Sequence, residues 1–310
     1  MPQPDRPALQ AAFAAAAEAL WPALHAALPG ISLEVLPTAD STNTRLLQRA
    51  RAGDGAPTAL VAIEQTAGRG RQGRHWHARP GDALTFSLAV PWSPADGDVA
   101  TLDGLSVAVG VALAEALHPD VRVKWPNDLW TLQAGGAPGK LGGVLIEVAP
   151  VAQQPAQRLV VIGVGLNVRG QAPGMEQAGA SPAQAGHAPA ASGGPAAVPY
   201  VSLAALAAMD PLPGQEGGVP GPAHPAAVWQ RVLPALVHAW LLFRSQGFAP
   251  FVERFARRDA LAGRDVTLWQ ADGRQQTGRA AGVDGAGRLL VHTAAGPVSW
   301  SAGDVSVRLA

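Results

Sequence analysis

The segment TALVAIEQTAGRGRQGRHW, residues 58 to 76, runs from a strand pattern straight into a loop of glycines and arginines. Residues 58 to 64 have the β-branched, apolar character of a buried strand. Glycine has no Cβ, so the main chain of the loop can approach a ligand closely. Each arginine adds a permanently charged fork of donors suited to phosphate or carboxylate. The pattern predicts an anion-binding loop that follows a buried strand and can close over its ligand.

Several nucleotide-binding motifs resemble this loop, and most of them can be excluded. Gly68, Gly70 and Gly73 satisfy the spacing G-x-G-x-x-G, but a dinucleotide-binding loop opens a helix, and residues 75 to 81 (HWHARPG) cannot do so. A protein kinase would carry a VAIK lysine and an HRD motif, whereas residues 61 to 64 read VAIE and HRD is absent. The Walker motif is also absent. An arginine–glycine tract that binds RNA stays an alternative, although such tracts usually come in repeats within a basic chain.

Composition narrows the class of protein. The chain has 310 residues, 48% of them hydrophobic, and its 23 basic and 23 acidic side chains balance. A neutral chain argues against a protein that lives on nucleic acid, and the lack of cysteine excludes disulfides and thiolate chemistry. Asp5 and Glu18 interrupt the alanine-rich start, which we expect to be an amphipathic helix rather than a signal peptide. No apolar run reaches the roughly 20 residues of a membrane span. We therefore expect a cytoplasmic protein with no membrane association.

Periodicity and turn residues place the secondary structure. Strands are expected at residues 31–36, 58–64, 84–90, 121–125, 140–148 and 158–168. Helices are expected at residues 1–28, from the Asp40–Ser41 N-cap to Gly53, and at 102–117, 226–243 and 248–261. These elements do not alternate in a regular βαβ rhythm. The fold class predicted is α+β, with a mixed β-sheet flanked by helices.

The chain divides into three regions and one insertion. We expect an N-terminal helix in residues 1–35, a large domain in 36–261 and a small β-barrel in 262–310, where short alternating runs are separated by glycine turns. At about 170–224 the large domain contains an insertion rich in Ala, Gly, Pro, Ser and Gln, which cannot repay its ordering entropy. Within it, residues 201 to 206 are apolar enough to dock.

Three further segments place polar residues beside apolar strands. Residues 124 to 128 (KWPND) follow a strand; Asn and Asp beside proline are also ordinary turn formers. Lys140 stands before Gly142–Gly143 at the start of an apolar strand, where a lysine can simply snorkel. Asn167 ends a glycine-studded strand, and glycine weakens a strand unless something approaches closely. Taken together with the loop, these residues favour chemistry on a phosphate, which needs positioning and charge neutralisation.

The motifs resemble those of the biotin–protein ligases. The matching segments, in the family's order, are STN at 41–43, EQTAGRGRQGRHW at 64–76, KWPND at 124–128, GKLGGVLIE at 139–147 and IGVGLN at 162–167. The resemblance is strong over about 36 to 168 and looser beyond. It implies a class II synthetase-like catalytic domain with a C-terminal SH3-like β-barrel. The family's repressor members carry a winged helix-turn-helix before the catalytic strands. Only some 35 residues precede those strands here, so we expect no DNA binding.

The resemblance also implies a reaction and its residues. Biotin would be activated by ATP to biotinyl-AMP, and a lysine of a biotin carboxyl carrier protein, from acetyl-CoA carboxylase or another biotin-dependent carboxylase, would then be biotinylated. The implied catalytic residues are Lys140, Arg71 and Lys124, with Asp128 as a ligand of Mg²⁺. The residues implied for binding biotin and the nucleotide are Ser41, Thr42, Asn43, Gln65, Gly68, Arg69, Gly70, Arg71, Trp76, Asn127, Lys140, Gly143, Gly165 and Asn167.

Two alternatives stay open at this point. A lipoate or octanoate ligase would share the catalytic fold, and a nucleic-acid-binding protein would use the loop and barrel as a grip. An exposed edge strand could also pair two copies of the chain as a homodimer.

Overall fold

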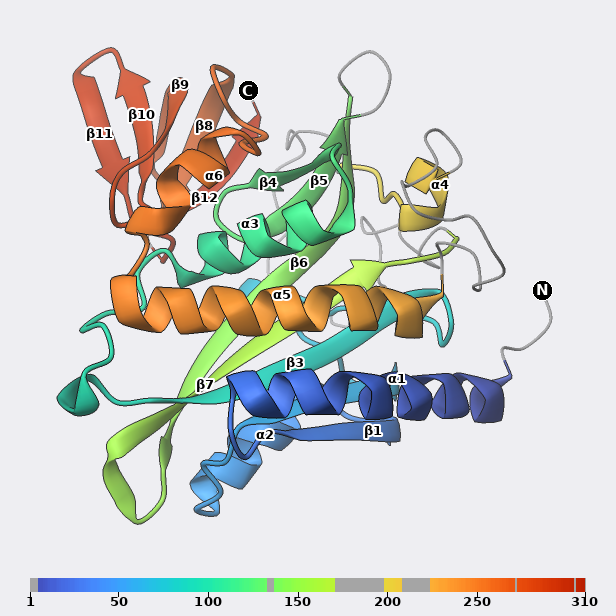
Figure 1. The fold of residues 1–310 in the computed structure, drawn as a ribbon. Helices are drawn as coiled ribbons and strands as arrows, with labels where there is room; N and C mark the ends of the chain where they lie inside the picture. The colour runs from blue at the N-terminus through green and yellow to red at the C-terminus, as the bar shows by residue number, and fades with distance from the viewer. Residues whose placement is uncertain are drawn as a thin grey trace, which may run out of the picture.

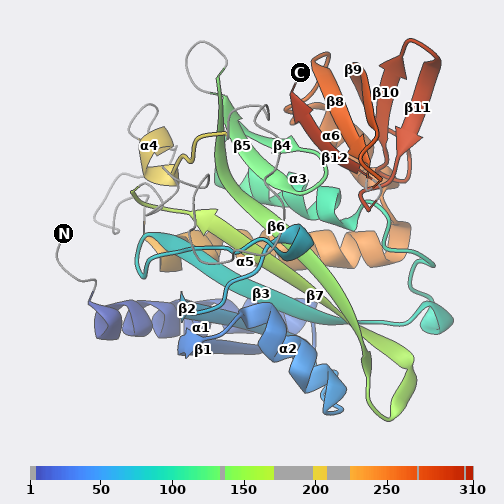
Figure 2. The same ribbon diagram turned by 180° about the vertical axis from the view of Figure 1, so that it is seen from behind.

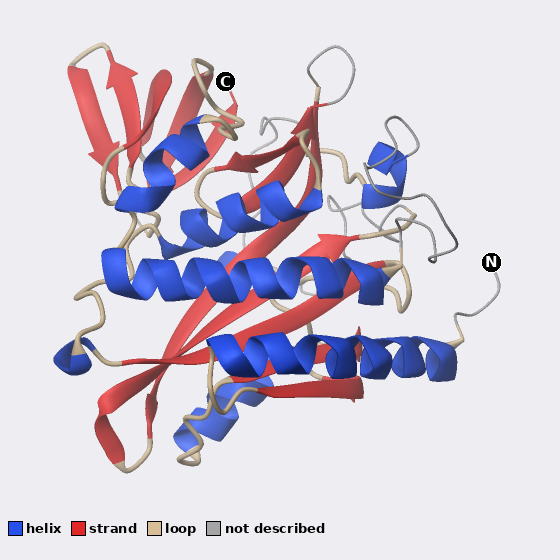
Figure 3. Cartoon of the chain, viewed as in Figure 1, coloured by secondary structure: helices blue, strands red, loops and turns tan. Residues whose placement is uncertain are grey.

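The structure is a computed structural model that describes residues 5–132, 137–170, 198–207, 224–270, 272–303 and 305–309. These residues form two β-sheets and a set of flanking helices (Figure 3). The larger sheet and its helices make up most of the molecule, and the smaller sheet sits at one end of it (Figure 1). The α+β class with a mixed sheet is confirmed.

The larger sheet has seven strands in the order β1-β2-β3-β7-β6-β5-β4. Its strands are β1 (Ser32–Ala39), β2 (Thr58–Gln65), β3 (Ala83–Trp92), β4 (Val121–Lys124), β5 (Asp128–Leu132), β6 (Pro138–Val151) and β7 (Gln154–Asn167). Strands β1 and β2 pair in parallel and the other neighbours are antiparallel. The long hairpin β6–β7 forms the centre, and β5, which the sequence suggested only as a turn, extends the sheet from residue 128.

Helices cover the two faces of this sheet unequally. Three long helices, α1 (Arg6–Ala27), α3 (Leu105–Leu117) and α5 (Pro225–Gln246), lie side by side over one face (Figure 1). The opposite face carries α2 (Thr42–Arg51), which packs on β6 and β7 and leaves the rest of that face open (Figure 2). Apolar burial is therefore concentrated under the three helices, and the open face is where a ligand can reach the strands.

Helix α5 has the length and apolarity of a membrane span. Its mean hydropathy passes that test, but more than half of the helix is buried inside the molecule. It packs between α1 and α3 and contacts β3. Its rings Trp229 and Trp240 are fully buried there. The apolar composition is explained by this position in the core.

The C-terminal sheet has five antiparallel strands in the order β11-β10-β9-β8-β12. These are β8 (Asp265–Gln270), β9 (Gln275–Val283), β10 (Leu289–Thr293), β11 (Gly296–Trp300) and β12 (Val305–Leu309). Strand β9 was not expected, because only Ala280 and Val283 of it are buried and its sequence does not alternate as an apolar strand does. This sheet touches the larger domain through the turn at Gly287, whose carbonyl accepts a hydrogen bond from the buried Trp125 indole at 3.0 Å.

The segment after α5 differs from the expected helix at 248–261. A 3-10 turn at Ala249–Phe251 is followed by the short helix α6 (Val252–Ala256), a turn and an isolated bridge at Asp259. The reason is pairing with β4: the Val123 N–H donates to the carbonyl of Arg258 at 2.7 Å, and the Val123 carbonyl accepts from the N–H of Ala260 at 3.0 Å. Between these two, Asp259 is largely buried, and its Oδ2 has no hydrogen-bond partner among the described residues.

Most of the predicted insertion at about 170–224 lies outside the described residues. The described part, residues 198–207, is docked on the sheet and includes α4 (Leu203–Ala207). The Pro199 carbonyl accepts a hydrogen bond from the Lys140 N–H at 2.7 Å, and Val201 donates one to the Lys140 carbonyl at 3.0 Å. This segment therefore takes the place of a neighbouring strand at the start of β6, where β7 does not reach.

Candidate active site

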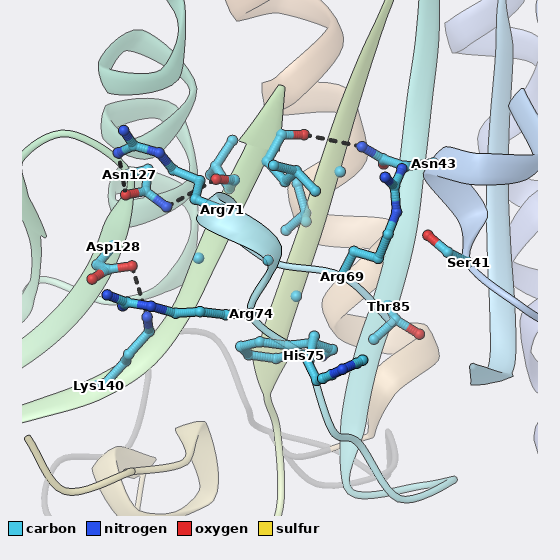
Figure 4. A pocket seen from close by; sticks show the side chains of 18 of the residues that line it. Ser41, Asn43, Arg69, Arg71, Arg74, His75, Thr85, Asn127, Asp128 and Lys140 are labelled. Carbon is cyan, nitrogen blue, oxygen red and sulfur yellow. Dashed lines mark hydrogen bonds and ion pairs between the residues drawn. The ribbon is translucent and has the colours of Figure 1, made fainter. Parts of the chain in front are cut away.

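A pocket lies on the open face of the large sheet, between the first turn of α2, the strands β6 and β7 and the glycine–arginine loop (Figure 4). The loop passes over it, and the C-terminal domain contributes Val307 at its edge. The residues lining it that the sequence predicted are Ser41, Thr42, Asn43, Gln65, Arg69, Gly70, Arg71, Trp76, Lys124, Asn127, Asp128, Lys140, Gly143 and Gly165.

One end of the pocket is polar, and its residues Ser41, Thr42 and Gln65 are uncharged. Ser41 caps α2, so the N-terminal turn of that helix faces the pocket. Gln65, at the end of β2, accepts the Thr42 N–H on Oε1 at 2.7 Å and lies 3.2 Å from the Thr42 hydroxyl. Because Oε1 is fixed in this way, the Gln65 amide group has its two donors free to turn toward the loop. This end can bind a neutral group that needs both donors and acceptors.

Asn43 is held from three sides at the same end of the pocket. Its Oδ1 accepts from the Ser87 hydroxyl at 2.5 Å. Its Nδ2 donates to Glu147 Oε2 at 2.9 Å and to the Leu145 carbonyl at 3.3 Å. Both amide hydrogens are thus used within the protein, and the side chain is only 3% exposed. Asn43 therefore serves the pocket mainly as part of its frame, rather than as a free donor for a ligand.

Glycines let the loop and Asn43 lie against β7. A Cβ on Gly163 would stand 2.3 Å from Asn43 Oδ1, and one on Gly165 would stand 2.6 Å from the ring of Trp76. The loop itself is closed by hydrogen bonds from Gly70 N–H to the Arg74 carbonyl and from Trp76 N–H to the Gly68 carbonyl. These glycines are required because side chains or backbone approach the strand where a Cβ would stand.

The loop arginines reach to opposite sides of the pocket (Figure 4). Arg69 pairs with Glu147 at 2.7 Å. Arg71 donates to Asn127 Oδ1 at 3.0 Å and also to the Ala302 carbonyl in the C-terminal domain. Burial lowers the pKa of Arg71, although a guanidinium remains charged at any physiological pH. The loop is therefore tied down at both ends of the pocket.

Lys140 and Asp128 form an ion pair at the other end, with Lys140 Nζ 2.8 Å from Asp128 Oδ1. A β-bulge places the lysine there. Strand β5 pairs Leu129 with Gly142 but Trp130 with Lys140, so Leu141 is the extra residue. Bulges of this kind redirect a side chain. Here the bulge brings Lys140 onto the same face as Gly143, whereas strict alternation would put them on opposite faces.

Lys124 is the most buried cation of the pocket, at 8% exposed. Its ammonium lies 5.9 Å from the centre of the Trp130 ring. Among the residues that the structure describes, none forms a hydrogen bond or ion pair with it. Burial lowers its pKa to about 8, and the positive charge of Lys140 and of two loop arginines, Arg71 and Arg74, contributes in the same direction against the opposing effect of Asp128. A bound anion would stabilise its charged form.

The charge of the pocket is therefore strongly positive. Five cationic side chains line it, and Asp128 is the sole carboxylate among its described lining residues. Arg74 belongs to this group but was not among the predicted site residues, although it stands in the loop motif. Tyr200 also lines the pocket, beside Lys140. It was missed because it lies inside the segment that composition marked as an insertion.

Two predicted residues do not line the pocket. Gly68 is set back in the loop, where a Cβ would stand 2.5 Å from the Trp76 carbonyl oxygen. Asn167 is 5% exposed and its Nδ2 lies 3.4 Å from the Lys140 carbonyl oxygen. Both residues act on the site through their neighbours: Gly68 shapes the loop, and Asn167 helps to fix the backbone of Lys140.

Comparison with known families supports one class of protein. Residues 35–167 match the model of the biotin/lipoate A/B protein ligase family, and residues 262–308 match the biotin protein ligase C terminal domain. The chain is 32% identical over 291 residues to the bifunctional ligase/repressor BirA of Escherichia coli K12, with 91% of this chain and 76% of that one covered. It is 30% identical over 268 residues to a biotin–[acetyl-CoA-carboxylase] ligase of Paracoccus denitrificans, with 84% and 95% covered.

Among solved structures, the fold matches the biotin protein ligase of Aquifex aeolicus in complex with biotin and ATP, with a TM-score of 0.65, 24% identity and coverage of 90% and 99%. At this identity the match shows the shared fold. The sequence relatives and the two family models establish the family. The chain belongs to the biotin/lipoate A/B protein ligase family, in its biotin protein ligase branch.

Proposed function

We propose that the protein is an ATP-dependent biotin–protein ligase. It activates biotin to biotinyl-5′-AMP and transfers the biotinyl group to a lysine of a carrier protein. The observation that carries this proposal is the division of one pocket into a neutral polar end at Thr42 and Gln65 and a strongly cationic end around Lys140 and Lys124. The first end suits an uncharged ureido ring, and the second suits a carboxylate beside phosphates.

In the first half-reaction, a carboxylate oxygen of biotin attacks the α-phosphorus of ATP, and the bond to the pyrophosphate leaving group breaks. Both reactants are anions, so their approach must be compensated by positive charge. Lys140 stands where it can bridge the carboxylate and a phosphate oxygen after leaving Asp128. Lys124 and Arg71 neutralise the phosphates, and Lys124 has no competing partner in the described protein.

In the second half-reaction, the amine of the acceptor lysine attacks the acyl carbon, and AMP leaves with the electrons of the acyl–oxygen bond. Until then the mixed anhydride must be kept from water. We assign this role to the loop from Gly68 to Trp76, because Arg69 and Arg71 hold it across the pocket. We assign Trp76 and Gly165 to the wall against which the acyl group packs.

A magnesium ion fits this pocket only as a companion of the nucleotide. Mg²⁺ prefers oxygen ligands and commonly takes one or two carboxylates together with substrate phosphates. Asp128, with Asn127 next to it, supplies one carboxylate, and the described residues contain no cluster of three His, Cys, Asp or Glu side chains. When bound, the ion would neutralise phosphate charge. We propose Asp128 as its protein ligand.

The acceptor that we propose is a biotin carboxyl carrier protein of acetyl-CoA carboxylase or of another biotin-dependent carboxylase, in the cytoplasm. We also propose that the protein can form a homodimer. Strand β6 pairs with β5 only up to Gly143. Val144 still bonds to Asn127, and beyond it no strand among the described residues pairs with β6 on that side, where Val148 is exposed. Sedimentation of the purified chain with and without biotin and ATP tests this assembly, and a monomer under all conditions would refute it.

The test of the proposed function is incubation of the full chain with biotin, ATP, Mg²⁺ and a biotin carboxyl carrier domain. We expect pyrophosphate release that depends on biotin, and a carrier domain heavier by one biotinyl group. Addition of excess lipoate or octanoate should not compete with labelled biotin. Transfer of lipoate in preference to biotin would reject biotin as the substrate, and salt-dependent affinity for nucleic acid without pyrophosphate release would reject the ligase.

A further inference from the structure

Glu147 lies outside the set of residues that the function has used, yet it joins two parts of the site. It is on β6, seven residues after Lys140, and its carboxylate points toward the pocket face, where it meets side chains from α2 and from the loop. One oxygen, Oε2, accepts both a hydrogen bond from Asn43 Nδ2 at 2.9 Å and one from Arg69 Nη2 at 2.7 Å. These two donors come from different segments, α2 and the glycine–arginine loop.

The pair with Arg69 differs from an ordinary surface ion pair. Exposed pairs contribute about 0–1 kcal/mol because both side chains must be ordered from solvent. Glu147 is already ordered by Asn43, which is 3% exposed and is itself fixed by Ser87 and the Leu145 carbonyl. The Glu147 side chain is one-quarter exposed and the Arg69 side chain 41% exposed, so Arg69 docks from the solvent side onto a fixed acceptor.

The position of Asn43 connects this acceptor to the neutral end of the pocket. Asn43 follows Thr42 in the first turn of α2, and Thr42 is the residue whose N–H and hydroxyl contact Gln65. A ligand at this end would add contacts to Thr42 and Gln65, and so would further stabilise the first turn of α2 with the bonds of Asn43 and Glu147 that are already formed. A better-ordered carboxylate binds Arg69 more strongly, and the loop follows Arg69.

We propose that Glu147 is a positioning residue. It couples the binding of a ligand at the neutral end of the pocket, which becomes the acyl end when biotin is bound, to closure of the loop Gly68–Trp76. The proposal rests on the proposed function, because it takes biotin as the ligand at Thr42 and Gln65. Glu147 touches neither reactant; it acts through Arg69 and Asn43. Its effect falls on how long the loop stays closed over the activated acyl group, and therefore on how much of the intermediate is lost to water.

The test compares Glu147→Gln with Glu115→Gln. The amide in Glu147→Gln would keep an oxygen for Asn43 but would lack the charge that holds Arg69. Glu115 makes a similar ion pair with Arg254 at 2.6 Å, far from the pocket on α3, and serves as the matched control. The rate of trypsin cleavage at Arg74, measured with and without biotin, reports directly whether the loop is closed. Release of biotinyl-AMP in the absence of carrier protein reports retention of the intermediate.

For Glu147→Gln we expect biotin to lose most of its protection of the loop, with cleavage about ten times faster than in the parent, a factor that corresponds to about 1.4 kcal/mol. Biotinyl-AMP release should rise by a similar factor, while the rate of pyrophosphate formation changes less than threefold. Glu115→Gln should match the parent. Arg69→Gln should reproduce the loss of protection by biotin and the faster release of biotinyl-AMP. The double variant, with both Glu147→Gln and Arg69→Gln, should differ little from either single variant in these two measurements.

The proposal would be overturned if biotin protected the loop of Glu147→Gln as well as it protects the loop of the unsubstituted protein. Additive effects of the two substitutions would also overturn it. If Glu147→Gln does not fold, Arg69→Gln alone carries the same test from the other partner. Failure of the proposed function is recognised separately, because the parent protein would then show neither protection by biotin nor release of pyrophosphate.

Discussion

Replacement of Gly163 by alanine tests whether the frame around Asn43 shapes the acyl end of the pocket. A Cβ at this position would lie 2.3 Å from Asn43 Oδ1, 2.9 Å from its Cγ and 3.1 Å from its Nδ2. Gly163 lies in the middle of β7, paired on both sides with β3 and β6, so the strand cannot move away. The Asn43 side chain must leave its position instead.

The cost follows from the bonds that Asn43 makes. Its departure breaks the hydrogen bonds to Ser87, Glu147 and the Leu145 carbonyl, each of which contributes about 1 kcal/mol. The buried Ser87 hydroxyl keeps its contact with Thr42, which limits the additional cost of an unsatisfied group. We expect a loss of about 2–4 kcal/mol in the free energy of unfolding, and weaker biotin binding by at least about tenfold, because the first turn of α2 loses its support.

Chemical denaturation and calorimetric titration with biotin measure the two quantities. Gly285→Ala is the control, since a Cβ at this position in the C-terminal domain would meet nothing within 4 Å. It should change stability and biotin affinity little. A Gly163→Ala protein with the stability and biotin affinity of the parent would refute the view that Asn43 frames this end of the pocket.

Three further predictions concern charged groups. Lys140→Ala should lower biotin-dependent pyrophosphate release by about two orders of magnitude or more, because the proposed mechanism assigns the bridge between the two reacting anions to Lys140. Near-normal release would reject the assignment. Lys124 has a pKa of about 8 in the free protein, and bound phosphates must raise this pKa. ATP binding should therefore take up protons at about pH 8 and should not do so at about pH 6.5. Titration calorimetry in buffers of different ionisation enthalpy measures the number of protons taken up, and a number that does not change with pH would contradict the prediction. Burial raises the pKa of Asp259 from 3.8 to about 6, so its ionisation costs stability as pH rises from about 4 to 6. Asp259→Asn should therefore be more stable than the parent at about pH 7.5, by up to about 3 kcal/mol, with no gain below about pH 4; an equal gain at both pH values would show that charge is not the cause.

Strand positions in the large domain were predictable because a buried strand needs a short run of apolar, β-branched residues between turn residues. Residues 58 to 64 and 158 to 168 are apolar, β-branched and bounded by turn residues, and β2 and β7 form there. The helix cap at Ser41 was also readable from one residue, since its hydroxyl accepts the Thr44 N–H at 3.5 Å. In these places local preference and tertiary packing agree.

The arrangement of the site was less accessible to sequence. The bulge at Leu141 has no composition signal, yet it decides that Lys140 faces the pocket. Asn43 was expected to bind the ligand, whereas its hydrogens are used by Glu147 and Leu145. These facts depend on which strand lies opposite which residue, and pairing across a sheet is set by the whole fold.

Tyr200 illustrates a different limit. The segment around it has a composition that predicts disorder, but three residues of it pair with β6 at Lys140. A few backbone hydrogen bonds and two buried apolar side chains, Val201 and Leu203, suffice to dock it. Averaging composition over the whole predicted insertion conceals such a short ordered piece.

The hydrogen bond from Trp125 to the Gly287 carbonyl has a consequence for protein engineering. Trp125 stands between Lys124 and Pro126 in the strongest motif of the chain, and Gly287 packs so closely that a Cβ there would stand 2.6 Å from Gly104 Cα. A chimera that takes its C-terminal domain from another ligase would therefore keep the position of Trp125 only if the grafted β9–β10 turn has a glycine whose carbonyl accepts the same hydrogen bond. The two domains are replaceable as a matched pair and not as independent modules.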